Sequence, residues 1–228
     1  MVDVRERFVP SGPLRIWTER VGDPGLPAVL MVMGSAAQAV SCPDALVGRL
    51  VERDVQVIRF DHRDTGRSSV VDFDAHPYTI SDLARDCLAV LDGYGLGSAH
   101  VAGTSLGGMI AQWLGVHAPG RVRSLTVMSS SLMGHDPGPV WARAIDPAAA
   151  ANHFRAVWMD DPGLKAPLSS ITAPTSIVHG DQDPVYPLGH GEALAAAIPG
   201  AVLQVVPGMG HVMTSPGLPE EIADLIRL

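Results

Sequence analysis

The stretch that decides the fold is Val101-Ala102-Gly103-Thr104-Ser105-Leu106-Gly107-Gly108-Met109-Ile110. It predicts a short buried strand, a turn of small residues and the first turn of a helix. The pattern Gly-x-Ser-x-Gly runs from Gly103 to Gly107. This spacing is typical of a nucleophile elbow, in which a serine sits in a strained conformation between strand and helix. Glycines on either side leave no Cβ where the strand and the helix press together. Ser105 is expected to lie at a helix N-terminus, which favours developing negative charge.

The sequence around the elbow predicts a mostly parallel sheet. The uninterrupted apolar run 28–33 is typical of a strand that is buried on both faces of such a sheet, and another strand is expected at 55–60. Further strands are expected at 5–9, 14–21, 125–128, 176–179 and 202–206, and helices at 43–53, 80–91, 192–198 and near the end of the chain. Strands that alternate with helices through short loops form right-handed crossovers. We therefore expect an α/β fold with helices on both faces of the sheet, opened by an N-terminal hairpin.

The length of 228 residues suits a single domain, and we expect residues 1–228 to form one. Residues 132–172 interrupt the alternation of strands and helices, and they predict a small helical lid inserted between two strands. Three aromatic residues of this segment, Trp141, Phe154 and Trp158, have two interpretations. They line a substrate pocket, or they pack the lid onto the core.

Composition excludes several classes of protein. Hydrophobic residues make up 46% of the chain and charged residues 18%, which excludes a disordered chain. The formal net charge is −8 with no basic cluster, so no nucleic-acid partner is expected. The two cysteines give no disulfide framework, and neither a signal peptide nor a membrane-spanning run is visible. We expect a cytoplasmic protein without a membrane partner; the sequence leaves its oligomeric state open.

Ser105 needs partners, because a serine hydroxyl becomes a strong nucleophile only when a base takes its proton and an acid orients that base. In open parallel sheets such groups gather beyond the carboxyl ends of the strands. Asp181 and Asp183 follow the strand expected at 176–179, and His211 follows the strand expected at 202–206. Asp183 is the preferred acid and Asp181 the alternative. Six other histidines are expected in loops or on helices, in contact with solvent: His62, His76, His117, His135, His153 and His190.

These residues carry a resemblance to a known family. The order Ser105, Asp183, His211 is that of the α/β-hydrolases, and the chain resembles this superfamily over nearly its whole length. Four segments of this chain are most similar to the aclacinomycin methylesterase group, namely 9–12, 61–68, 75–78 and 208–211. The lid of that group is longer than the segment 132–172 of this chain. The resemblance implies that Ser105 is the nucleophile, that His211 is the general base and then acid, and that Asp183 orients His211.

The resemblance also implies an oxyanion hole made of backbone N–H groups. One donor is Leu106, the residue after the nucleophile, and the other comes from the loop of Gly34 and Ser35. Ser35 is preferred over Gly34. Many relatives have His-Gly where this chain has Met33 and Gly34, but a backbone donor does not depend on that side chain. Met33 is expected to contact the substrate.

The combined prediction is a carboxylic ester hydrolase that acts on a small-molecule ester through an acyl-enzyme. No P-loop, His-Glu-x-x-His motif or cysteine cluster is present in the sequence, so neither a cofactor nor a metal is expected. A lactonase, a thioesterase or a perhydrolase would use the same groups, and a non-catalytic ligand-binding module on this fold is a further alternative. Epoxide hydrolases and haloalkane dehalogenases of this fold are disfavoured, because they need a carboxylate at the position of Ser105.

Overall fold

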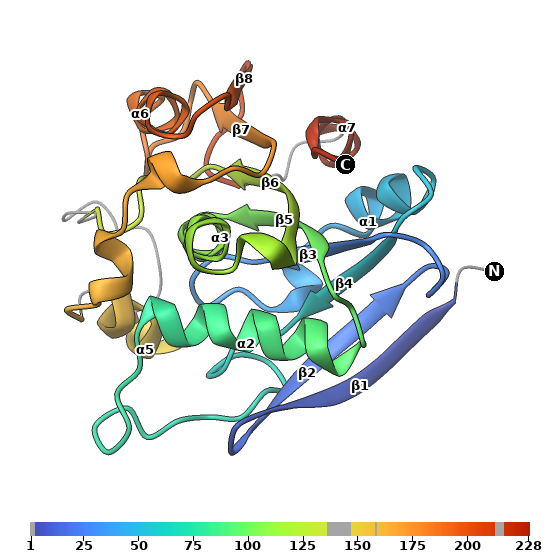
Figure 1. Ribbon diagram of the computed structural model, residues 1–228, viewed down its shortest axis with the longest axis vertical. Coiled ribbons are helices and arrows are strands. Elements are labelled where there is room, and N and C mark those ends of the chain that lie inside the picture. The colour runs from blue at the N-terminus through green and yellow to red at the C-terminus, as the bar shows by residue number, and fades with distance from the viewer. Residues whose placement is uncertain (1–2, 136–146, 158, 213–216) are drawn as a thin grey trace.

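The computed structural model describes residues 3–135, 147–157, 159–212 and 217–228 (Figure 1). Within these residues the strands form a single eight-stranded sheet in the order β1-β2-β4-β3-β5-β6-β7-β8. The strands are β1 Val4–Ser11, β2 Leu14–Val21, β3 Ala28–Val32, β4 Gln56–Phe60, β5 Ala99–Thr104, β6 Val122–Met128, β7 Thr175–Gly180 and β8 Val202–Val206. Each predicted strand is confirmed, with ends that differ by at most three residues.

The pairing of the strands explains their composition. β1 and β2 form the expected antiparallel hairpin, and β2 pairs antiparallel with β4. All other pairs are parallel. Every residue of β3 and of β4 is buried. The apolar sequence of β3 predicts this for a strand inside a parallel sheet, whereas β4 also buries the polar residues Gln56 and Arg59.

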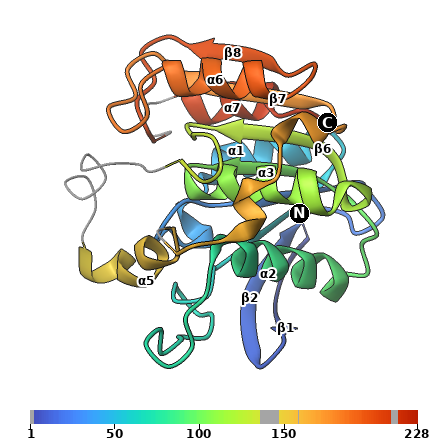
Figure 2. The ribbon, with the colours of Figure 1, turned by 60° about the vertical axis from the view of Figure 1, so that its left-hand side comes forward.

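Helices cover both faces of the sheet, as predicted (Figures 1 and 2). On one face α1 (Asp44–Val51) and α7 (Leu218–Leu225) share an apolar cluster with the sheet. On the other face α2 (Ile80–Gly93), α3 (Leu106–His117) and α6 (Gly189–Ala197) contribute to a larger cluster. Ten successive residues of α3 are buried, which places this helix in the middle of its layer directly after the elbow. The α/β fold with a doubly covered, mostly parallel sheet is therefore confirmed.

The segment between β6 and β7, where the sequence predicts the lid, contains α5 (Pro147–Val157) and the 3₁₀ helices η3 (Pro162–Lys165) and η4 (Leu168–Ser170). Figure 1 shows α5 beside the N-terminal end of α2. Asp161 fastens the segment there, since its carboxylate accepts hydrogen bonds from the backbone N–H (2.8 Å) and the hydroxyl (2.7 Å) of Ser81. Burial opposes ionisation of Asp161, but these hydrogen bonds outweigh it and lower its pKa. That the segment acts as a lid stays a prediction.

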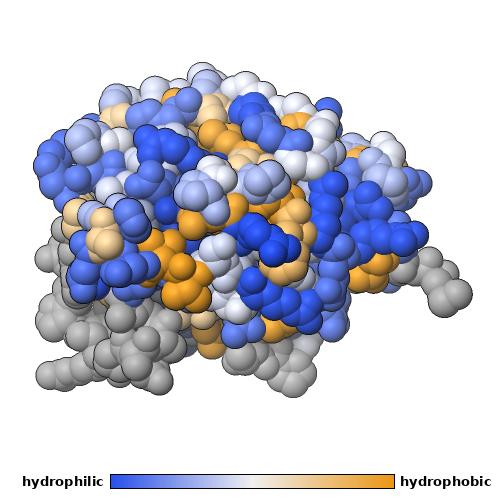
Figure 3. Space-filling model, turned by 90° about the horizontal axis from the view of Figure 1, so that it is seen from below, coloured by the Kyte–Doolittle hydropathy of each residue, from blue (hydrophilic) through white to orange (hydrophobic). Residues whose placement is uncertain are grey.

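One face of the molecule carries mainly polar side chains among its described residues. Figure 3 shows the face that lies lowest in Figure 1, on which hydrophilic residues surround small apolar patches. A search of the described residues finds no helix that combines the length and the apolar character needed to cross a bilayer.

Candidate active site

The nucleophile elbow has the geometry that its sequence predicts. Ser105 lies between β5 and α3 with φ 54° and ψ −119°, a backbone conformation that costs a non-glycine residue about 1–3 kcal/mol. A Cβ on Gly103 would lie 2.1 Å from the carbonyl oxygen of Gly107. A Cβ on Gly107 would lie 2.0 Å from the carbonyl oxygen of Val32. Only glycine therefore fits at both positions, and the strained turn is held between β3 and α3.

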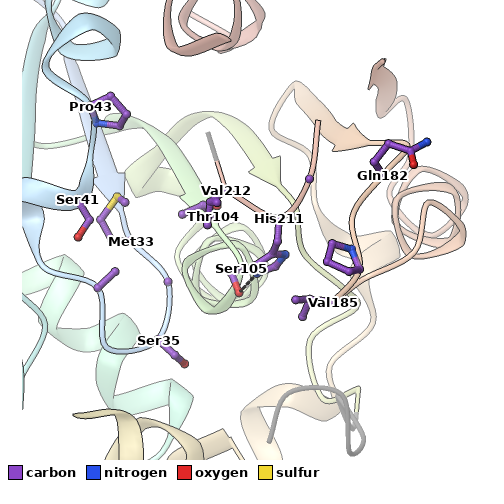
Figure 4. A pocket seen from close by; sticks show the side chains of 14 residues that line it. Met33, Ser35, Ser41, Pro43, Thr104, Ser105, Gln182, Val185, His211 and Val212 are labelled. Atoms are coloured by element: carbon purple, nitrogen blue, oxygen red, sulfur yellow. Dashed lines mark hydrogen bonds between the residues drawn. The ribbon is translucent and has the colours of Figure 1, made fainter. Parts of the chain in front are cut away.

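The structure brings Ser105, His211 and Asp183 together. Nε2 of His211 lies 3.1 Å from the hydroxyl oxygen of Ser105 (Figure 4). Nδ1 of His211 lies 2.9 Å and 3.1 Å from the two carboxylate oxygens of Asp183. A carboxylate only accepts hydrogen bonds, so Nδ1 carries the proton and the neutral ring presents Nε2 to the hydroxyl as an acceptor. The three side chains follow the carboxyl ends of β5, β7 and β8, where the topology predicts them.

The two candidate acids have different surroundings. Asp183 is buried, and its carboxylate also accepts the backbone N–H groups of Val185 (2.8 Å) and Tyr186 (2.9 Å). Burial alone raises the pKa of Asp183, but the hydrogen bond to His211 and these two backbone donors outweigh burial and lower it. Asp181 is exposed, and its carboxylate accepts the N–H of Gly208 instead. Of the two, Asp183 is the residue that contacts the imidazole.

A cavity of about 710 Å³ opens beside Ser105 and His211. Among the described residues that line it there is no Asp, Glu, Lys or Arg, and most of its walls are apolar. Its side chains include Met33, Pro43, Val185, Val212 and Gln182. Figure 4 shows Met33 and Ser35 on one side of Ser105, with His211 and Val185 on the other. The described lining of this chamber is therefore uncharged, and the Ser105 hydroxyl and the His211 imidazole lie at its edge.

The other residues expected to touch the substrate do not all reach this chamber. Met33 lines it, and contact of Met33 with a substrate stays a prediction. Phe154 is half-buried and packs against the main apolar cluster, which matches the second interpretation given for the aromatic residues of the segment. Trp141 and Trp158 lie outside the described residues. In the described part of the chain no group of three His, Cys, Asp or Glu side chains is placed to hold a metal ion.

The loop after β3 lies against the elbow and supplies backbone donors. A Cβ on Gly34 would lie 3.2 Å from the Cβ and 3.7 Å from the hydroxyl oxygen of Ser105. The N–H of Ala37 donates to the carbonyl of Gly34 (3.2 Å), and the N–H of Ala36 donates to Nδ1 of His153 (3.0 Å). The N–H groups of Ala36 and Ala37 therefore already have acceptors, and the choice of Gly34 or Ser35 as oxyanion donor stays a prediction. Across the site, Leu106 is the first residue of α3, where backbone N–H groups have no acceptor within the helix.

Two histidines expected in contact with solvent are buried, so that prediction is wrong for them. His62 is 0% exposed and His153 is 2% exposed. His62 lies two residues after the end of β4, and its Nε2 lies 3.1 Å from the carbonyl oxygen of Met33. The two imidazoles meet edge to face with centroids 5.7 Å apart. A position two residues after a buried strand is the signal in the sequence that distinguishes His62 from an ordinary loop histidine.

The burial of His62 predicts a specific loss of stability in acid. Burial, then the neighbouring His153, lower the pKa of His62 to about 3, whereas an unfolded histidine titrates near 6.5. Between these values the unfolded chain binds the proton and the folded chain does not, so stability falls as pH falls. We expect this residue to add about 1.4 kcal/mol of destabilisation per pH unit between pH 6.5 and pH 3. Urea unfolding at pH 7, 6 and 5 measures the slope.

Replacement variants isolate that contribution. His62→Gln is expected to flatten the dependence of the unfolding free energy on pH, even where it lowers stability at pH 7. His76→Gln is the matched control, because His76 is exposed and its replacement is expected to leave the slope as it is in the unmodified protein. Equal slopes for His62→Gln and the unmodified protein would contradict the prediction.

Comparison with known proteins places these features in a family. The family model described as "alpha/beta hydrolase fold" matches residues 27–156. Rhodomycin D methylesterase DnrP of Streptomyces peucetius is 46% identical over 130 residues, which are 57% of this chain and 44% of that protein. This chain thus matches less than half the length of that methylesterase. The relationship supports the resemblance to methylesterases found in the sequence.

Solved structures agree on the fold. Est816, described as an N-acyl homoserine lactone degrading enzyme, superposes with a TM-score of 0.78 at 26% identity, covering 97% of this chain and 99% of that one. The enol-lactonase from Burkholderia xenovorans LB400 has a TM-score of 0.80 at 17% identity, covering 96% of this chain and 99% of that one. The family model covers more than half of the chain and includes the elbow. The chain therefore belongs to the alpha/beta hydrolase fold family.

Proposed function

We propose that the protein is a serine hydrolase that cleaves carboxylic esters, with Ser105 as nucleophile, His211 as base and Asp183 as the acid that orients His211. The observation that carries this proposal is the continuous contact from Asp183 through His211 to Ser105 at the edge of an uncharged cavity. The methylesterase relationship supports the ester as substrate class.

The proposed reaction follows from the directions of these hydrogen bonds. Ser105 Oγ attacks the ester carbonyl as Nε2 of His211 takes its proton, and the carbonyl electron pair moves onto oxygen. The N–H of Leu106 and one N–H of the Gly34–Ser35 loop stabilise that oxyanion. His211 then protonates the leaving alcohol, which leaves the acyl group on Ser105. A water that gives a proton to Nε2 of His211 attacks the acyl-enzyme carbonyl. His211 then returns that proton to Oγ of Ser105 as the acyl–oxygen bond breaks, and the acid product leaves.

The lining of the cavity restricts the substrate. A charged ester would lose its hydration among apolar walls without gaining an ion pair from the described lining residues. We infer a neutral small-molecule ester, with Met33, Pro43 and Val212 in contact with its apolar parts. Lactones and thioesters present the same carbonyl to Ser105, so a panel of p-nitrophenyl esters, methyl esters, thioesters and lactones ranks these substrate classes by kcat/KM.

Covalent labelling tests the proposal. A fluorophosphonate mimics the tetrahedral intermediate and reacts with an activated serine. We expect one adduct per chain, located on Ser105 by peptide mass spectrometry. Labelling is expected to be absent in Ser105→Ala and strongly slowed in His211→Ala, because the base is then missing.

The control separates activation from accessibility. Ser41 also lines the cavity but no base is assigned to it, so Ser41→Ala is expected to label at the rate of the unmodified protein. Absence of any adduct on the folded, unmodified protein would overturn the proposed hydrolase and favour a non-catalytic ligand-binding module.

A further inference from the structure

We propose that His153 of α5 is a positioning residue for the oxyanion hole. It fixes the peptide between Ser35 and Ala36, and thereby the direction of the backbone donors beside Ser105. This inference rests on the proposed function and goes beyond it, since it gives a role in catalysis to a side chain that does not touch the reacting atoms. It also connects the predicted lid segment to the chemistry.

One ring nitrogen of His153 accepts a hydrogen bond and the other donates one. Nδ1 accepts the backbone N–H of Ala36 at 3.0 Å, and Nε2 lies 2.7 Å from the carbonyl oxygen of Arg63. A backbone N–H only donates and a carbonyl only accepts, so the ring is neutral with its proton on Nε2. A buried imidazole in this state satisfies a donor and an acceptor at the same time. Its position relative to the loop is therefore specific.

The loop needs such support because its conformation is strained. Gly34 to Ala37 form a turn closed by the bond from the N–H of Ala37 to the carbonyl of Gly34. Ala36, the third residue of the turn, has φ 57°, a left-handed conformation that an L-residue other than glycine avoids. Rotating the peptide between Ser35 and Ala36 would return Ala36 to an ordinary φ, as in a type I turn. The bond to Nδ1 of His153 holds the N–H of that peptide in its present direction.

Rotation of the peptide between Ser35 and Ala36 would change the surroundings of Ser105. Gly34 lies against Ser105, and Figure 4 shows the loop that carries Met33 and Ser35 beside the elbow, on the opposite side of Ser105 from His211. His62 holds the start of the loop through the carbonyl of Met33, and it packs against the ring of His153. His62 and His153 therefore contact the loop just before and just after Gly34 and Ser35, the predicted donors. Donors are useful in catalysis only when their positions are fixed before the oxyanion forms.

α5 has a second anchor that does not touch this loop. The side-chain amide of Asn152 donates to the carboxylate of Asp64 (3.1 Å) and to the carbonyl of Val71 (3.3 Å). Asn152 and His153 are adjacent in sequence and both fasten α5 to the body of the protein. Only His153 reaches the loop beside Ser105, so Asn152 provides the control that separates anchoring of the helix from positioning of the donors.

The main test compares two replacements of His153. Phenylalanine fills the space but offers no acceptor to Ala36. In His153→Phe we expect kcat on a p-nitrophenyl ester to fall about 100-fold, near the lower end of the loss for a missing oxyanion donor, with KM changed less than about threefold. Affinity for a trifluoromethyl ketone, which forms an oxyanion on Ser105, is expected to fall by a similar factor. In His153→Asn the side-chain oxygen replaces Nδ1 as acceptor, and kcat is expected to return to within about tenfold of the unmodified enzyme.

Controls keep the outcomes separate. Asn152→Ala is expected to lower thermal stability and leave kcat within about threefold, since it loosens α5 without freeing Ala36. If His153→Phe does not fold, His153→Gln takes its place, because glutamine keeps a donor for Arg63. Two outcomes would overturn the inference about His153 and leave the proposed hydrolase function in place. One is unchanged inhibitor affinity in a folded variant that offers Ala36 no acceptor. The other is an equal loss of kcat in Asn152→Ala and His153→Phe. An unmodified protein that neither turns over esters nor labels at Ser105 would overturn both proposals.

Discussion

Replacing Asp183 by asparagine is expected to lower the turnover number of the proposed esterase by about 10⁴-fold, as the corresponding change does in serine proteases with the same three groups. The carboxylate now accepts the proton on Nδ1 of His211. An asparagine amide would turn its N–H₂ group to Nδ1, because its oxygen is drawn to the backbone N–H groups of Val185 and Tyr186. The imidazole would then carry its proton on Nε2 and face Ser105 as a donor, unable to take the hydroxyl proton.

Asp181→Asn is the matched control. The two aspartates are two residues apart and follow the same strand, but the carboxylate of Asp181 accepts the N–H of Gly208, a bond that an asparagine oxygen also accepts. We expect this variant to keep kcat within about threefold. Steady-state kinetics on one ester shows which of the two aspartates orients His211. Thermal unfolding verifies that both variants fold. A large loss in Asp181→Asn together with a small one in Asp183→Asn would show that the acid is assigned wrongly.

The sequence predicts the elbow and the sheet because both depend on local properties, namely the size of the side chains and the pattern of apolar residues. Gly103 and Gly107 stand where any Cβ would overlap backbone atoms, so the spacing of small residues reports the close approach of strand and helix. The uninterrupted apolar run of β3 indicates burial on both faces. Once the strands are known to be parallel, residues after their carboxyl ends must lie at one edge of the sheet. That argument is enough to bring Ser105 and His211 together from positions 106 residues apart.

Other features depend on contacts that no local pattern encodes. Asp181 and Asp183 both follow β7, and the choice between them depends on which carboxylate meets the turn N–H groups of Val185 and Tyr186. His153 contacts Ala36 across 117 residues of sequence, and nothing around either residue predicts that meeting. The position of α5 relative to the loop is a tertiary property. The sequence therefore does not predict the burial of His62 and His153, although both hold the loop after β3 through Met33 and Ala36.

Replacing Gly107 by alanine is expected to lower the free energy of unfolding by about 3 kcal/mol, which corresponds to a fall of about 6–12 °C in Tm for a chain of this size. The added Cβ would lie 2.0 Å from the carbonyl oxygen of Val32 and 2.7 Å from that of Met33. Both are backbone atoms, so no side-chain rotation relieves the overlap, and α3 must move away from the end of β3. Activity is expected to fall with stability, because Leu106 and the Gly34–Ser35 loop are thereby pushed apart.

Gly48→Ala is the matched control, and it is expected to raise the free energy of unfolding rather than lower it. Gly48 lies inside α1, is exposed, and a Cβ there meets nothing within 4 Å. Alanine in a helix interior is favoured over glycine by about 0.5–1 kcal/mol, so Tm is expected to rise by about 1–4 °C. Differential scanning calorimetry of both variants measures the contrast. Because the two substitutions make the same chemical change in two helices, a Gly107→Ala protein as stable as the unmodified one would mean that α3 does not press on β3. In that case the close contact that strains Ser105 would be absent.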